Sequence, residues 1–293
     1  MTDNQTDTAA PTASLVRDTG LGRVSARGPD AASLLEAQSM TALAGLADRR
    51  LRRCAFADSK GRVVATALAW HTGDDWRLLL PAGEAEWFVT HLLRFRFRSK
   101  VEIGVGTHWR VAALFGDGIE EALATAGLER PETGTALVHD GVEVAMGADG
   151  HCLLAAEQQC MNTVLDALAG ACADMEPSRW RGVSMLAGDA EIREATRGRF
   201  LPQFLDFDTR EVIAWDKGCY PGQEVIARLQ HRGTVKHRLL LLAVEIDAAP
   251  GTRAEIAGIT VDVVDHGTLP DGTPVTQVIA PFPFEPALES LAL

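Results

Sequence analysis

The chain has 293 residues, 46% of them hydrophobic and 23% charged, a soluble globular balance with room for one large or two to three smaller domains. Its net charge of −12 argues against broad nucleic-acid binding, which needs a basic face, although the arginine-rich residues 94–100 could form a local basic patch. Five cysteines without pairing rhythm or zinc-finger spacing argue against a disulfide framework and favour a reducing cytoplasm.

The first residues of the chain, 1–14, are polar. They lack the basic start and the apolar centre of a signal peptide, so we expect a disordered tail there. No apolar run approaches the length of a membrane span, so we expect no membrane partner.

Beyond the tail, strands alternate with single helices. The expected strands are 21–26, 54–56, 63–69, 76–80, 101–105, 110–115, 142–146 and 152–155. The expected helices are 30–47, which Asp30 would cap, and 83–95, 118–126 and 161–171. This alternation indicates an α+β fold with antiparallel sheets rather than a doubly wound parallel sheet.

The pattern changes after Arg238. Residues 239–246 are strongly apolar and predict a strand, and the remaining predicted strands are short and separated by Gly and Pro. We therefore expect a body over residues 15–238, with two α+β halves that meet near 106–110, and a small β-barrel over 239–293.

The most informative motif is Lys217-Gly-Cys-Tyr-Pro-Gly-Gln-Glu224. Residues 211–215 before it are β-branched and aromatic and predict a strand, and 223–230 predict a short helix. Cys219 would then lie where a strand turns into a helix. Free backbone N–H groups and the positive end of the helix dipole favour a thiolate there, as a functional thiol requires.

Two nearby cations, Lys217 and Arg228, could stabilise the thiolate further. Arg228 also lies four residues beyond Glu224, so an ion pair worth about 0.2–0.5 kcal/mol is expected. The usual role of a free cysteine is that of a small buried hydrophobe. We assign that role to the cysteines in apolar surroundings, Cys54, Cys152, Cys160 and Cys172.

The octapeptide closely resembles the Lys-Gly-Cys-Tyr-x-Gly-Gln-Glu signature of the YgfZ family, folate-binding proteins related to the T-protein (aminomethyltransferase) of the glycine cleavage system. Phe200-Leu-Pro-Gln203 is similar to the family's Phe-Ile-Pro-Gln. Asp58-Ser-Lys-Gly-Arg-Val63 resembles its early Gly-Arg turn, and residues 92–103 resemble its basic helix exit. Three further pieces follow the family's order downstream, namely Ala227-Arg228, Arg232-Gly233 and Lys236-His-Arg238. The resemblance covers most of residues 20–238.

This resemblance implies a T-protein-like body around a central hole, with a C-terminal barrel and with tetrahydrofolate or a derivative as the ligand. Trp180 matches a tryptophan of the family's folate pocket, and Leu21 stands where the family has a second pocket aromatic. Tyr220, Gln223 and Arg228 would hold the turn and line the pocket.

The resemblance also implies a cytoplasmic role in assembling or repairing iron–sulfur clusters in client enzymes, including tRNA-modifying ones. Cys219 would be the working thiol, with Lys217 tuning it. The implied partners are a folate and iron–sulfur client or assembly proteins; neither a metal site nor direct nucleic-acid binding is expected.

Two alternatives stay open. One is a folate-dependent aminomethyltransferase or demethylase, for which Asp48 is a candidate carboxylate near the folate. The other is a scaffold whose thiol binds a partner without folate. A nucleophilic pair of Cys219 with His231 is disfavoured, because nothing in the sequence supplies a third, orienting group.

Overall fold

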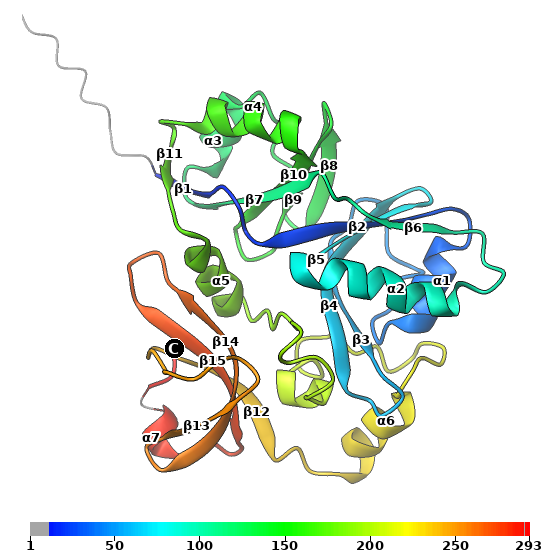
Figure 1. The fold of residues 1–293 in the computed structure, drawn as a ribbon, viewed down its shortest axis with the longest axis vertical. Helices are drawn as coiled ribbons and strands as arrows, with labels where there is room; N and C mark the ends of the chain where they lie inside the picture. The colour runs from blue at the N-terminus through cyan, green and yellow to red at the C-terminus, as the bar shows by residue number, and fades with distance from the viewer. Residues whose placement is uncertain (1–11, 290) are drawn as a thin grey trace, which may run out of the picture.

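The computed structural model describes residues 12–289 and 291–293, and the chain forms three sheets with helices packed around them (Figure 1). Most of the expected tail, residues 1–11, lies outside the described residues. The strands are β1 Ala13–Val16, β2 Leu21–Arg27, β3 Arg52–Ala57, β4 Val63–Thr72, β5 Asp75–Pro81, β6 Glu102–Val105, β7 Trp109–Gly116, β8 Thr135–His139, β9 Val142–Met146, β10 Cys152–Glu157, β11 Cys172–Asp174, β12 His237–Leu242, β13 Arg253–Ile256, β14 Ile259–Thr268 and β15 Pro274–Pro281. The helices are α1 Ala31–Gln38, α2 Ala85–Arg96, α3 Ile119–Thr125, α4 Gln158–Leu168, α5 Pro177–Leu186, α6 Gln223–Arg232 and α7 Pro286–Glu289, with short 3-10 turns η1 Ala82–Glu84 and η2 Pro202–Leu205.

The first half of the body is a five-stranded antiparallel sheet in the order β3-β4-β5-β2-β6. The expected meander is confirmed. Helices α1 and α2 cover this sheet with their apolar residues, and the rings of Phe56 and Phe88 meet edge to face at 4.8 Å. Burial of such aromatic side chains is the main source of stability in a core of this kind.

The second half is a six-stranded sheet in the order β11-β1-β7-β10-β9-β8, under α3 and α4. The change of sheet falls between β6 and β7. However, β1 comes from the N-terminus and joins this second sheet, antiparallel to β7 and parallel to β11. The expected tail boundary at residue 14 is therefore too late, because Ala13 and Leu15 are buried in the core. A strand of four residues is too short to show a period in the sequence.

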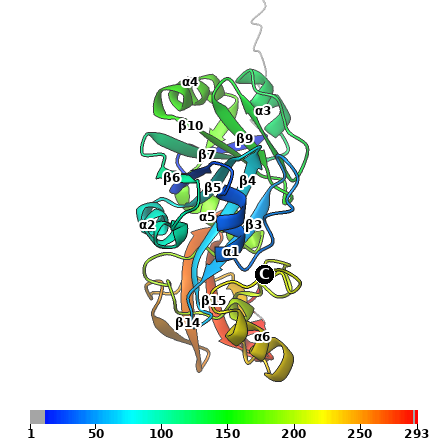
Figure 2. The same cartoon turned by 90° about the vertical axis from the view of Figure 1, so that its right-hand side faces the viewer.

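The C-terminal part forms a four-stranded antiparallel sheet in the order β12-β15-β14-β13, which lies below the body in both views (Figures 1 and 2). It begins at His237, close to the expected start at residue 239. Helix α5 packs against it at Gly182, where a Cβ atom would lie only 2.2 Å from the Thr268 carbonyl oxygen. The chain thus has the expected α+β fold with antiparallel sheets.

Two local expectations are wrong. The helix expected over 30–47 ends at Gln38, because Met40 turns into a different core cluster and Ser39 pairs with Phe56. Residues 211–215 form no strand. Val212 and Ile213 are apolar because they anchor a loop in the core, and both their N–H groups donate to the Phe207 carbonyl oxygen.

Within the described residues, no helix combines the length and the apolar character that crossing a membrane requires.

Candidate functional site

Cys219 lies in an irregular loop just before α6, with its thiol exposed and free. The predicted helix after it is confirmed as α6, whose N-cap is Gly222. The four other cysteines are buried or half-buried, as expected. The structure therefore places a solvent-accessible thiol at the end of the loop that leads into a helix.

The ammonium group of Lys217 is bonded to groups at the end of α1. Its Nζ atom donates to the carbonyl oxygens of Glu36, Ser39 and Thr41, at 2.7, 2.8 and 2.9 Å. It also pairs with the Glu36 carboxylate at 3.1 Å, and its side chain is only 3% exposed. Burial lowers the pKa of Lys217, while Glu36 opposes that change. The contacts of this lysine thus anchor the Cys219 loop to the end of α1, a role that the sequence did not reveal.

Gly222 lets the octapeptide pack against the turn between β3 and β4. Its φ is +78°, and a Cβ atom there would lie 2.3 Å from the Asp58 carbonyl oxygen and 2.5 Å from the Gly61 Cα atom. No side chain fits in that space, so glycine is required. Two motifs more than a hundred residues apart in the sequence are therefore in direct backbone contact.

The other motif residues support the same assembly. Gln203 is fully buried and its Nε2 atom donates to the Ile226 carbonyl oxygen of α6 at 2.8 Å. Arg238 donates to the Gln203 carbonyl oxygen and forms a bidentate pair with Asp208. These buried and part-buried hydrogen bonds support the segment that carries the thiol, and they are costly to break.

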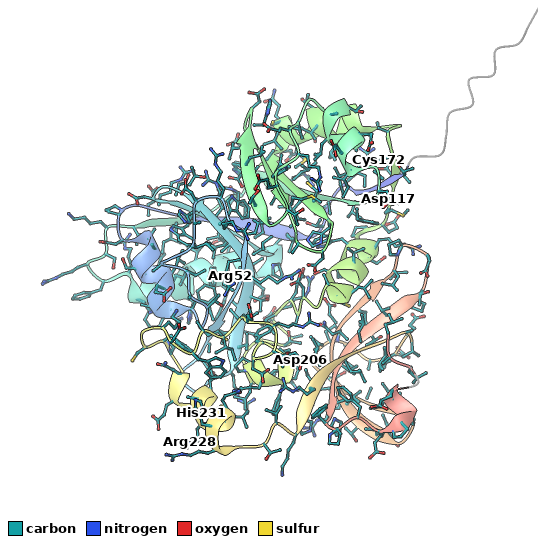
Figure 3. All side chains as sticks on the ribbon, turned by 180° about the vertical axis from the view of Figure 1, so that it is seen from behind. Arg52, Asp117, Cys172, Asp206, Arg228 and His231 are labelled. Carbon is teal, nitrogen blue, oxygen red and sulfur yellow. The ribbon has the colours of Figure 1, made fainter. Side chains whose placement is uncertain are left out.

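The remaining octapeptide and helix residues differ in exposure. Tyr220 is a buried core residue, and burial raises its pKa to about 12. Gln223 is half-buried at the first position of α6. Arg228 is exposed and forms the expected ion pair with Glu224 at 2.9 Å, while His231 packs edge-on against Trp215 at 6.0 Å (Figure 3).

A separate pocket of about 420 Å³ lies in the body, and its volume suits a small organic ligand. Its walls come from the first sheet, from the start of β10, from α5 and from the segments 187–191 and 207–212. Trp180 of α5 and Leu21 of β2 both line it. Tyr220, Gln223 and Arg228 are not among its lining residues, and their expected role in binding a folate stays a prediction.

Trp180 presents an unpaired donor in this wall. The indole is 2% exposed, and its Nε1–H has no hydrogen-bond partner among the described residues. The ring meets His151 edge to face at 5.1 Å, and Nδ1 of that histidine also lacks a partner. Burial lowers the pKa of His151, which favours the neutral ring. Buried polar atoms without partners are rare and are satisfied when a ligand or water binds.

Two half-buried carboxyl groups line the same pocket. Asp189 pairs with Arg53 and accepts a hydrogen bond from Ser184 at 3.2 Å. Burial raises the pKa of Asp189, which Arg53 opposes. Burial also raises the pKa of Glu191 to about 7, so at neutral pH this carboxyl exists in both protonation states. The wall can therefore both donate to and accept from a polar ring. Nothing in the sequence distinguished these two residues or His151.

Cys219 does not line the pocket, but the segment that leads into its loop does. Glu211 and Val212 line the pocket and lead into the octapeptide. The positive charge of Lys217 acts on Cys54, which lines the pocket, although burial dominates and raises the pKa of Cys54 to about 12. Arg52 on the pocket wall and Arg228 on α6 lie well apart (Figure 3).

No protein-family model matches the chain. The tRNA-modifying protein YgfZ of Pectobacterium carotovorum is 27% identical over 227 residues, which cover 76% of this chain and 68% of that protein. The tRNA-modifying protein YgfZ of Escherichia fergusonii is 24% identical over 269 residues, which cover 88% of this chain and 82% of that protein. The predicted resemblance to the YgfZ family is confirmed.

The structural comparison agrees with this relationship. The glycine cleavage system aminomethyltransferase T from Bartonella henselae superposes with a TM-score of 0.77, covering 92% of this chain and 79% of that one, at 16% identity. The chain thus has the T-protein fold. The segments on which the resemblance rests are in contact with one another and support the Cys219 loop; they are the octapeptide, the turn at Asp58–Val63, Phe200-Leu-Pro-Gln203 and Arg238.

Cys219 should react with iodoacetamide at pH 7 at least about tenfold faster than any other cysteine, because it alone combines an exposed thiol with a loop position. Burial raises the pKa values of Cys54 and Cys152 to about 12, which leaves almost no thiolate there. Mass-spectrometric mapping after brief labelling measures the order. Cys160 is the informative comparison, because it is half-buried whereas the other three cysteines are buried. If Cys160 were labelled before Cys219, the assignment of Cys219 as the most reactive thiol would be contradicted.

Proposed function

We propose that this chain is a folate-binding protein that supports iron–sulfur enzymes, including tRNA-modifying ones, with Cys219 as its working thiol. The observation that carries the folate part is the pocket wall with the unpaired Nε1–H of Trp180. The T-protein fold and the name of the YgfZ relatives support the same direction.

The residues of the pocket fit a pterin group. Leu21, Leu79 and Trp180 supply apolar surface for its faces. Trp180 Nε1–H can donate to a ring acceptor, and the carboxyls of Asp189 and Glu191 can accept from ring N–H and amino groups. When bound, tetrahydrofolate would supply one-carbon chemistry or act as a ligand that stabilises the body.

The thiol part of the proposal rests on the contrast between Cys219 and its surroundings. An elaborate set of buried contacts positions a cysteine that itself remains exposed. Cys219→Ser is nearly isosteric and should preserve the fold while abolishing support of iron–sulfur enzymes in a complementation assay. Normal complementation by this variant would remove the thiol from the function.

The aminomethyltransferase alternative finds less support in the structure. Asp48 is exposed, accepts a hydrogen bond from the Gly73 N–H at 3.0 Å and lies 3.2 Å from His71. It does not line the pocket. Its contacts explain it as a loop residue, without a role beside a folate.

Replacing Trp180 by Phe should weaken tetrahydrofolate binding about fivefold, because the change keeps an aromatic ring but removes the Nε1–H donor. Trp70→Phe is the matched control, since Trp70 is equally buried in the same core cluster but does not line the pocket. Calorimetric titration measures both. Equal losses in the two variants, or no loss in Trp180→Phe, would favour a scaffold that works without folate.

A second arm of this experiment adds surface instead of removing a donor. Leu21→Trp should tighten tetrahydrofolate binding several-fold, because an indole offers a stacking face that leucine lacks. Leu21 lines the pocket, so the added ring has a wall to occupy. Thermal unfolding of the unliganded variant separates a binding effect from a change in stability.

A further inference from the structure

A second cavity, of about 380 Å³, lies between the body and the C-terminal sheet. It takes residues from the β3–β4 turn, from η2 and the segment before it, and from β12 to β15. Strands β12, β14 and β15, which contribute lining residues, lie in the lower part of the molecule in Figures 1 and 2. It shares no lining residue with the folate pocket.

The cavity is basic, although the whole chain carries a net charge of −12. Three arginines line it, from three separate segments, and they are Arg62, Arg199 and Arg253. One carboxylate, Asp262, lies among them. It is 3.4 Å from Nε of Arg253 and 4.0 Å from Nη2 of Arg199, so it neutralises the group only in part.

The guanidinium groups retain free donors. Each carries five N–H groups in a planar fork. Within the described part of the chain, the side chain of Arg62 donates to the Arg199 carbonyl oxygen, and Arg253 contacts only Asp262. Since the Arg253 side chain is 73% exposed, its fork is accessible to a ligand.

An aromatic surface lies beside these charges. The half-buried Phe204 and His237 both line the cavity, and their rings are 5.3 Å apart at 47°. A ligand with an anionic group and a planar ring would use both features, because arginine forks bind phosphate bidentately and an aromatic face stacks a base.

We propose that this cavity binds the phosphate group of a nucleotide. The guanidinium groups of Arg62, Arg199 and Arg253 hold the phosphate oxygens, and Phe204 with His237 contacts the base. The nucleotide can be free or part of an RNA chain, and both present the same chemistry to these residues.

The position of the cavity links it to the thiol loop. Arg62 belongs to the turn whose backbone packs directly against Gly222 of the octapeptide. Phe204 lies in η2 next to Gln203, which holds α6. We therefore expect a ligand that binds Arg62 to affect the backbone contact between this turn and Gly222, which supports the Cys219 loop.

Calorimetric titration with AMP tests the proposal by a series of charge changes. AMP should bind more tightly than inorganic phosphate, because only AMP offers a base. Arg253→Gln should weaken AMP binding roughly fivefold, and Arg253→Glu should weaken it further. Asp262→Asn removes the carboxylate and should tighten binding, which a merely destabilised variant would not do.

Controls separate this site from other effects. Arg27→Gln, which removes an exposed strand arginine paired with Asp75, should leave AMP binding unchanged. Trp180→Phe should weaken tetrahydrofolate binding and leave AMP binding unchanged. Arg253→Gln should weaken AMP binding and leave tetrahydrofolate binding unchanged, so failure of the nucleotide proposal is distinguishable from failure of the folate proposal.

Two further titrations complete the test. A short oligoadenylate that binds more tightly than AMP identifies RNA as the source of the phosphate, and equal affinity identifies the free nucleotide. The proposal would be overturned if AMP did not bind, or if its affinity did not change in the Arg253 and Asp262 variants. It would also be overturned if tri-γ-glutamate, a carboxylate polyanion, bound more tightly than AMP.

Discussion

Glu143→Gln should lower the free energy of unfolding by about 3–5 kcal/mol, because it leaves the buried Arg23 without a counter-charge and leaves Arg77 with Asp75 alone. Glu143 of β9 is 2% exposed and pairs with Arg23 of β2 at 2.6 Å and with Arg77 of β5 at 2.8 Å. The guanidinium of Arg23 also stacks over the Trp109 ring at 4.0 Å. This charged triad joins the two sheets of the body.

Chemical denaturation measures the loss. The control is Asp174→Asn, which breaks the exposed bidentate pair with Arg17 and should cost no more than about 1 kcal/mol. A loss for Glu143→Gln as small as that of the control would show that the triad adds nothing to the joint between the sheets.

The triad should also affect the pocket that we propose binds folate. Leu21 and Leu79, in the strands that carry its arginines, line one wall, and Leu153 of the second sheet lines another. A triple variant with Met at both arginine positions and Leu at Glu143 should recover much of the stability, because replacing a whole buried ionic cluster by apolar side chains is often neutral or stabilising. Recovery in this variant would distinguish charge imbalance from loss of packing volume.

Lys217→Met should cost about 3–5 kcal/mol of unfolding free energy as well. Methionine fills a similar volume, but it leaves the Glu36 carboxylate and the carbonyl oxygens of Glu36, Ser39 and Thr41 without their ammonium donor. The same carboxylate accepts the N–H groups of Leu43 and Ala44, so the loop after α1 should loosen too.

Hydrogen exchange of residues 36–44 and 215–222, together with denaturation, measures this loss. Arg228→Met is the matched control from the same motif region, because Arg228 makes one exposed ion pair and should change stability by less than about 0.5 kcal/mol. Equal effects of the two substitutions would show that Lys217 acts only at the surface, as a cation near the thiol would.

The meander over β3 to β5, the helices α2, α3 and α6 and the antiparallel α+β class were predictable from the sequence. Their apolar residues follow a period of two or of 3.6 over a sufficient length, and Gly, Asp and Pro mark their ends. Helix α1 ends early because Met40 packs into a different core cluster and Ser39 pairs with Phe56, and such distant partners leave no local pattern.

The octapeptide, with its exposed thiol before a helix, and the relationship to the YgfZ family could be read from the sequence alone, because short motifs keep their order and spacing along the chain. The direction of Lys217, the contact of Gly222 with the β3–β4 turn and the separation of Tyr220 and Arg228 from the pocket depend on tertiary packing. The same holds for the pocket pair His151 and Trp180 and for the basic cavity. The side chains of this pair, and those that line this cavity, lie far apart in the sequence. Only the folding of both sheets and the C-terminal part brings them within hydrogen-bonding or van der Waals distance.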